Sequence, residues 1–192
     1  MRGYFRSYAS LAALTAMALA PGGAQAQESG GLEEIFITAQ RRTENLQEVP
    51  ITVNTLSGES MRDIFVAGED IRALSARIPS LNIESSNGRV APRFYIRGLG
   101  NTDFDLAASQ PVSVIVDDVV LENVVLKSTP IFDVDRVEVL KGPQGTLFGR
   151  NTPAGIVKFD TRRPTMEPEG YGTVSYGNRN TFTAEGAFSG PL

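Results

Sequence analysis

The stretch Arg136-Val-Glu-Val-Leu-Lys-Gly-Pro-Gln-Gly-Thr-Leu-Phe-Gly-Arg-Asn151 decides how the rest of the chain is interpreted. It begins with an alternating strand, Arg136 to Leu140, and runs into a glycine-rich turn. A second strand, Ile156 to Thr161, follows after Ala154-Gly155. The glycines fit neither a P-loop, which needs Gly-Lys-Ser/Thr, nor a G-x-G-x-x-G dinucleotide turn. They predict a tight chain reversal with positive φ angles and close backbone approach.

Short strand patterns dominate the rest of the middle of the chain. The predicted strands are Val49 to Leu56, Leu81 to Glu84, Arg93 to Arg97, Val112 to Val116 and Val119 to Leu121. The adjacent acids Asp117 and Asp118 are expected in a solvated turn rather than as an acid/base pair, since neighbours on a strand point to opposite faces.

Two short helices are expected between the first strands. Ser57 can cap a helix that places Met61, Ile64 and Phe65 on one face and that Gly68 ends. Asp70 to Arg77 reads as a second helix, ended by Pro79, and Pro130 to Phe132 as one helical turn. The mixture predicts a small α+β domain with a mostly antiparallel or mixed sheet.

Residues 1–26 have the pattern of an export signal. Arg2 and Arg6 precede an apolar run from Leu11 to Ala20, and Ala24-Gln25-Ala26 has the form of a cleavage site. Ten apolar residues span ~15 Å of helix, about half of the hydrocarbon core. A transmembrane anchor is the alternative, and this length disfavours it.

Composition removes several classes of function. The chain has no cysteine and no histidine, which excludes disulfides, a lipidated cysteine, Ser-His or Cys-His catalysis and His- or Cys-based zinc sites. A net charge of −4 offers no basic surface for nucleic acid. Asn101-Thr-Asp-Phe-Asp105 could ligate a hard cation, but a polar loop is favoured. We expect no enzyme, no cofactor and no metal site.

The last residues change character. Tyr171 to Gly177 and Thr181 to Ser189 are alternating runs joined by Asn178-Arg179-Asn180. In the second run Phe182, Ala184, Gly186 and Phe188 share one face, and Thr181, Thr183 and Glu185 share the other. Apolar-out and polar-in strands of about this length are typical of a transmembrane β-barrel hairpin, and a soluble hairpin is the alternative.

Four segments resemble the TonB-dependent outer-membrane receptor family. Arg136 to Asn151 is similar to its plug-domain signature throughout, and Phe94-Tyr-Ile-Arg-Gly-Leu-Gly100 to its Ile-Arg-Gly segment. Val114-Ile-Val-Asp-Asp118 resembles its apolar strand that ends in Val-Asp, and Glu34 to Ala39 its TonB box. The alternative for Glu34 to Ala39 is an edge strand at the start of the domain.

The resemblance implies a layout and an activity. The layout is a signal peptide (1–26), a periplasmic segment with the TonB box (27–44), a plug domain (45–165) and the first two antiparallel strands of a transmembrane β-barrel that this chain leaves incomplete (166–192). The activity is uptake of a scarce nutrient, most specifically a ferric siderophore-type chelate. Cobalamins, sugars and aromatic compounds are the other substrates that the family admits. Only residues 27–31 precede the box region, which predicts no periplasmic signalling domain.

Three sets of site residues follow from the resemblance. The expected contacts to a TonB-type energy-transducing partner, by β-strand addition, are Glu34, Ile35, Phe36, Ile37, Thr38 and Ala39. The signature residues, whose charges would face the wall of a barrel of about 22 strands, are Arg97, Gly98, Glu138, Lys141, Gly142, Gly145, Gly149 and Arg150. The substrate-loop candidates are Asn87, Arg89, Arg93, Asn101, Asp103 and Asp105. The alternative for the signature residues and the substrate-loop candidates is that they are solvent-exposed surface residues without a specific function.

The chain departs from the family at two places. It has Ala154-Gly155 where two glycines are common, and Lys158 and Asp160 where an amide and an apolar residue are common. Charges on a strand inside a barrel lumen need a partner or water.

Two other interpretations of the function stay open. A truncated plug could bind TonB in the periplasm without transport, and an exported enzyme is a weaker third reading because no catalytic constellation is present.

Overall fold

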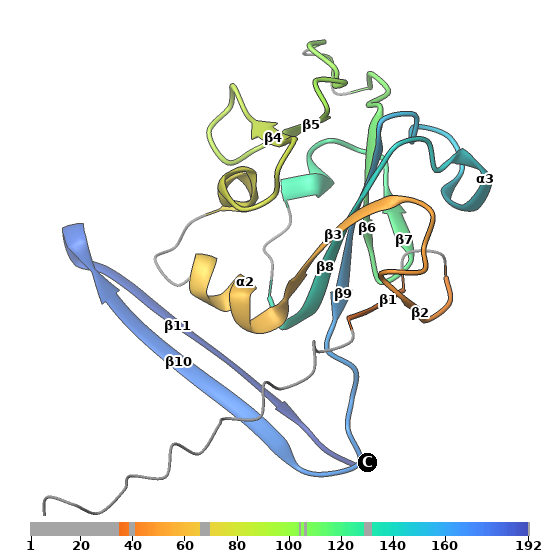
Figure 1. Ribbon diagram of the computed structural model, residues 1–192. Helices are drawn as coiled ribbons and strands as arrows, with labels where there is room; N and C mark the ends of the chain where they lie inside the picture. The colour runs from red at the N-terminus through yellow and green to blue at the C-terminus, as the bar shows by residue number, and fades with distance from the viewer. Residues whose placement is uncertain are drawn as a thin grey trace, which may run out of the picture. The chain divides into compact units, whose positions relative to one another are not determined.

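A computed structural model describes residues 35–38, 41–65, 70–103, 105, 107–128 and 132–191 (Figure 1). The predicted signal peptide, the spacer after it, Glu34 and Ala39 of the box and the helix-ending Gly68 lie outside the described residues. So do Pro130 and Ile131 of the predicted helical turn.

A five-stranded mixed sheet forms the centre of the domain. Its strands, in spatial order, are β3 (Thr52–Ser57), β8 (Val134–Lys141), β9 (Gly155–Thr161), β6 (Val112–Val116) and β7 (Val119–Leu121). β6 and β9 run parallel and every other neighbouring pair is antiparallel. The mixed sheet predicted from the sequence is therefore confirmed.

The remaining elements are short. The helical ones are α2 (Gly58–Phe65), η2 (Ile71–Ala76), η3 (Leu126–Ser128), α3 (Gly145–Phe148) and η4 (Asn178–Asn180). The strands outside the sheet form three antiparallel pairs, β1 (Phe36–Ile37) with β2 (Glu44–Asn45), β4 (Leu81–Glu84) with β5 (Arg93–Ile96), and β10 (Glu169–Gly177) with β11 (Thr181–Ser189). No helix in the described part of the chain combines the length and apolar character needed to cross a membrane.

Local sequence signals account for most element ends. The Ser57 hydroxyl accepts the Ser60 N–H at 3.3 Å and caps α2 as expected. The second helix is a 3-10 helix that Asp70 caps by accepting the Arg72 N–H. Several boundaries differ from the prediction, since β8, β9 and β10 each begin one or two residues earlier than expected. The first long strand starts at Thr52 and not at Val49, beyond Pro50, which has no N–H for a ladder. Arg97, with φ of 54°, lies in a turn after β5.

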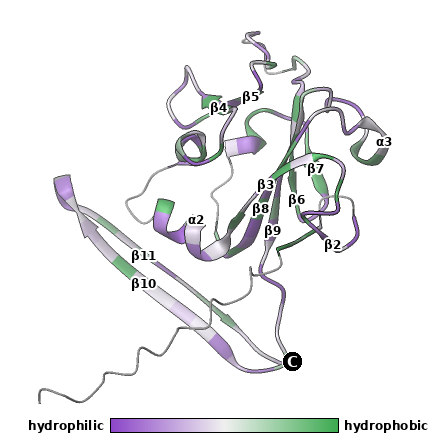
Figure 2. Cartoon of the chain, viewed as in Figure 1, coloured by the Kyte–Doolittle hydropathy of each residue, from purple (hydrophilic) through white to green (hydrophobic). Residues whose placement is uncertain are grey.

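The two faces of the sheet carry separate hydrophobic clusters, and Figure 2 shows the hydrophobic residues concentrated in these strands. The larger one packs α2, η2 and the β4–β5 pair against Val137, Val139 and Val157. The smaller one contains Ile37, Val49, Ile115, Leu140, Phe148 and Ile156. Strand residues alternate between the faces, so Val139 and Leu140 belong to different clusters.

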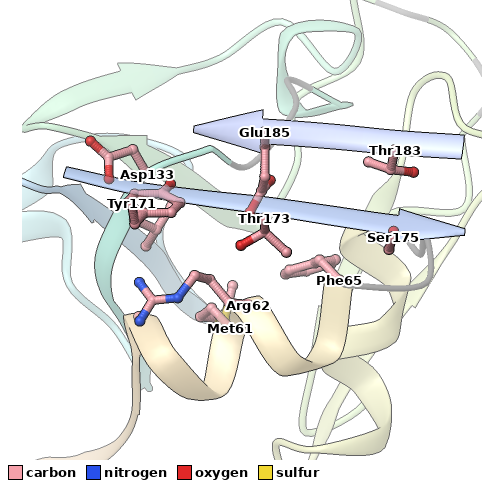
Figure 3. Close-up of a pocket in the computed structure, with 11 residues that line it drawn as sticks. Met61, Arg62, Phe65, Asp133, Tyr171, Thr173, Ser175, Thr183 and Glu185 are labelled. Carbon is pink, nitrogen blue, oxygen red and sulfur yellow. The ribbon is translucent and has the colours of Figure 1, made fainter. Parts of the chain in front are cut away.

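The β10–β11 hairpin has one apolar and one polar face. Val174, Tyr176, Phe182 and Phe188 are 65–82% exposed, whereas Tyr171, Thr173, Ser175, Thr183 and Glu185 are half-buried. Those half-buried residues line a pocket with Met61, Arg62 and Phe65 of α2 (Figure 3). The alternation predicted for this segment is therefore present, with the polar side towards α2.

Candidate functional site

The glycine-rich turn joins β8 to β9 through one turn of helix. Gly142 N–H donates to Ala154 C=O at 2.9 Å, and Gly149 N–H donates to Gly145 C=O at 3.1 Å. Gly142 and Gly149 have positive φ, as predicted, whereas Gly145 begins α3. At Gly155, φ is 145° and a Cβ would lie 2.2 Å from the Leu140 oxygen, so only glycine fits there.

Residues 35–38 lie against the plug. Phe36 and Ile37 pair with Asn45 and Glu44, and Leu46 N–H donates to Ile35 C=O at 2.9 Å. Ile37 is 1% exposed and sits in the smaller cluster, whereas Ile35 and Phe36 are about half exposed (47% and 49%). The segment is extended, as strand addition needs, and it is already paired within its own chain.

Two charged side chains of β8 form hydrogen bonds with the backbone on either side of Ile37. Arg136 donates to the Phe36 carbonyl at 3.3 Å. The Thr38 N–H donates to Glu138 Oε1 at 2.7 Å. Arg136 and Glu138 are two residues apart on β8 and therefore lie on the same face. They bind one backbone acceptor and one backbone donor of residues 35–38, so these contacts do not depend on the side chains of the segment.

A cation from β9 completes this group. Lys158 Nζ donates to Thr38 Oγ1 at 3.0 Å and to Asp160 Oδ1 at 2.5 Å. In the sheet register Glu138 lies opposite Lys158, and Arg136 lies opposite Asp160. Glu138, Lys158 and Asp160 are called the charge cluster below. Burial raises the pKa of Glu138, while the Thr38 N–H and Lys158 lower it.

The signature residues fall into two groups. Glu138 is fully buried beneath Thr38, and Lys141 donates to the Pro79 carbonyl at 2.5 Å. Arg97 and Gly98 occupy an exposed turn, where Arg97 donates to Thr52 Oγ1 at 3.2 Å. Arg150 is exposed and makes a two-pronged pair with Glu122, at 3.0 and 2.7 Å. The first two residues therefore act inside the plug, and Arg97 and Arg150 remain candidates for facing a barrel wall.

The substrate-loop candidates form two loops beside the β4–β5 pair, in the upper part of Figure 1. Asn87 and Arg89 are exposed, whereas Arg93 is 8% exposed and donates to Ser86 Oγ at 2.8 Å. Tyr95 ties the loops together by donating to Glu84 at 2.7 Å and to the Asn101 carbonyl at 3.1 Å. Arg93 thus supports the loop from within.

The second loop uses its polar side chains locally. Asn101, Asp103 and Asp105 each accept the backbone N–H two residues on, at 2.8 to 3.0 Å. Among the residues that the structure describes, no group of three or more His, Cys, Asp or Glu is arranged to hold a metal ion. These side chains shape the loop.

Sequence reasoning missed three members of the site. Arg136 was regarded only as part of the signature, and Lys158 and Asp160 only as departures from the family pattern. The signal was present as charges at i and i+2 on two consecutive strands, which place Arg136 and Glu138 on one face. Their target, the segment one hundred residues earlier, carries no pattern that points to them.

The sequence model of the TonB-dependent receptor plug domain matches residues 45–156. The pesticin receptor of Yersinia enterocolitica is 30% identical over 186 residues, covering 95% of this chain and 26% of that protein. This chain therefore spans about a quarter of the length of that relative.

Solved structures share the fold. The ferric yersiniabactin uptake receptor FyuA from Yersinia pestis superposes with a TM-score of 0.63 and 28% identity, covering 74% of this chain and 22% of that one. FpvA of P. aeruginosa, bound to pyoverdine, gives a TM-score of 0.64 at 22% identity, covering 82% and 20%. The second likeness bears on the fold alone.

Proposed function

This chain belongs to the TonB-dependent receptor plug domain family, and we propose that it is the plug-bearing N-terminal part of an outer-membrane receptor that imports a ferric siderophore-type chelate. The observation that carries the proposal is the short extended segment 35–38, which pairs with β2 and donates the Thr38 N–H to Glu138. The siderophore class is supported by the likeness to FyuA, whose name states uptake of ferric yersiniabactin.

The hairpin supports a membrane setting for the complete protein. Its exposed face carries Val174, Tyr176, Phe182 and Phe188, which suit lipid, and its half-buried face carries Thr173 and Glu185, which suit a polar lumen. Two strands alone leave open edges that lipid does not tolerate, so transport requires the rest of a closed barrel. The chain is proposed to reach the Gram-negative outer membrane after cleavage of residues 1–26. The soluble periplasmic plug module leaves this apolar face unexplained.

In the proposed mechanism, the energy-transducing partner binds the segment and pulls on it. Substrate binds above the plug, near the loops that contain Asn87, Arg89, Asn101, Asp103 and Asp105. Binding biases residues 34–39 away from the plug and towards the periplasm. A TonB-type partner then adds a strand to the released backbone, and pulling on it rearranges the plug. No step needs a catalytic side chain or a cofactor.

The experiment uses the complete receptor in its own bacterium under iron limitation. Uptake and binding of radioactive ferric siderophores are measured in the wild type and in Ile37→Pro. Proline removes an N–H from the strand and disturbs β pairing, so uptake should be lost while substrate binding at the cell surface persists. Val119→Ala, at an exposed position of β7 outside the segment, is the control and should transport. Unchanged uptake by Ile37→Pro would contradict the proposal.

A further inference from the structure

We propose that the charge cluster of Glu138, Lys158 and Asp160 is a latch that positions residues 35–38 and blocks strand addition while it is closed. The inference rests on the proposed function, in which this segment is the partner's binding site. The new elements are the residues that hold the segment in the closed state and the dependence of that state on the positive charge of Lys158.

The docked segment and a partner-bound segment need the same backbone atoms. In the docked state, Ile35 C=O accepts from Leu46 N–H, Phe36 C=O accepts from Arg136, and Thr38 N–H donates to Glu138. Backbone groups of neighbouring strand residues point to opposite edges, so Ile35 C=O faces β2 while Phe36 C=O and Thr38 N–H lie on the other edge. A partner's strand added to that second edge would need Phe36 C=O and Thr38 N–H for its own ladder. The two states therefore exclude each other, and the latch residues compete directly with the partner.

Lys158 is the cation of a cluster that also holds two carboxylates, Glu138 and Asp160. Lys158 is 2% exposed, pairs with Asp160 on its own strand and lies opposite Glu138 of β8 in the sheet register, close enough for its charge to lower the pKa of Glu138. Asp118, from the β6–β7 turn, lies 3.9 Å from Lys158, and Arg136 faces the cluster from β8. Residue Thr38 covers these groups from above, donating its N–H to Glu138 and lying within hydrogen-bonding distance of Lys158 and Asp160.

Loss of the cation leaves the two carboxylates unbalanced beneath the segment. A buried charge whose partner is removed is strongly unfavourable, and the cluster can relieve this by exposing itself to water. The exposing motion is departure of residues 35–38. In Lys158→Met, burial and the neighbouring carboxylate raise the pKa of Glu138 further than in the wild type. Docking in that variant should therefore recover as the pH falls and Glu138 takes up a proton.

The chain has no cysteine, so single cysteines report opening cleanly. Ile115→Cys lies in the smaller cluster with Ile37, and Val114→Cys lies beside it in the larger cluster on the opposite face. Thiol labelling of the full chain is measured without any partner, and each rate is normalised at each pH to the rate in the unfolded chain. Faster labelling of Ile115→Cys alone reports departure of the segment, whereas faster labelling of both cysteines reports a general loss of packing in the domain.

Lys158→Met should speed labelling of Ile115→Cys about tenfold at pH 7.5, which corresponds to about 1.4 kcal/mol, and leave Val114→Cys unchanged. The double variant Lys158→Met/Glu138→Gln should return the rate to within about threefold of the wild type, and the rate of the single variant should fall as the pH is lowered. Labelling at the wild-type rate, equal acceleration of both cysteines, or no rescue by Glu138→Gln would each overturn the latch.

A separate arm tests the partner. The periplasmic domain of the TonB-type protein is titrated against the same variants, and Lys158→Met should bind it about tenfold more tightly, because a larger fraction of the segment is free. If labelling responds as expected but the affinity does not change, the latch stands and the assignment of the segment to the partner fails. The two failures are therefore distinguishable.

Discussion

Gly155→Ala should destabilise the plug more than any other single methyl added in the signature turn. The Gly155 φ of 145° lies in a region that side chains rarely adopt, which costs about 1–2 kcal/mol. The new Cβ would also lie 2.2 Å from the Leu140 oxygen and 2.9 Å from Ile96 Cδ1. Leu140 is held in the β8–β9 ladder, so relief requires backbone movement at about 1–3 kcal/mol. Together the expected loss is about 2–5 kcal/mol.

The assay is urea denaturation of the full chain in mild detergent, followed by far-ultraviolet circular dichroism because the chain has no tryptophan. Gly145→Ala is the matched control. It begins α3, and the nearest atom to its Cβ is Thr152 Oγ1 at 3.8 Å. This control should change the free energy of unfolding by less than about 1 kcal/mol, in the stabilising direction. A loss below about 1 kcal/mol in Gly155→Ala would refute the argument from φ and close approach.

Two further predictions concern the plug and the hairpin. Burial lowers the pKa of Lys127 from 10.5 to about 8, so its charged form opposes folding below pH 8 and the stability should rise as the pH increases from 8 to 10.5. Relative to Lys127→Met, measured by the same urea titration, the rise should be about 3 kcal/mol, and parallel pH profiles would contradict it. In the complete receptor, Val174→Arg should reduce the amount found in outer-membrane fractions by immunoblot, since Arg facing lipid costs about 2–4 kcal/mol. Ser175→Arg, on the opposite face, should be tolerated, and equal losses would contradict the assignment of faces.

Local sequence signals were sufficient to predict most of the strands. The ranges Leu81 to Glu84, Val112 to Val116 and Val119 to Leu121 are strands with those bounds. Asp117 and Asp118 form the turn between two of them, with φ of 47° and 68°. These segments were predictable because apolar alternation and turn residues are properties of neighbouring positions.

An edge strand was the alternative for Glu34 to Ala39, and Phe36–Ile37 is a short strand, but the contacts of the docked segment were beyond that kind of reasoning. A two-residue strand such as Phe36–Ile37 has no period to detect, and its partners Glu44 and Asn45 are no stronger. Its other contacts join Thr38 to residues 100 and 122 positions away. Lys158 and Asp160 looked like charges that needed the barrel lumen or water. They find partners within the plug, because Lys158 pairs with Asp160 and both lie within hydrogen-bonding distance of Thr38 Oγ1.

The division of the core explains how one segment can leave without unfolding the rest. Ile37 packs only into the smaller cluster, on the face opposite α2 and η2. Undocking gives up the burial of one isoleucine, about 1.5–3 kcal/mol, and a hydrogen bond to a charged acceptor, about 1.5–3 kcal/mol. The freed residues regain backbone conformational entropy, about 1–2 kcal/mol each, which offsets part of this loss. Each 1.4 kcal/mol by which the docked state stays favoured lowers the apparent affinity of a strand-adding partner about tenfold. A substrate that binds the undocked form more tightly by a similar factor would be sufficient to release the segment.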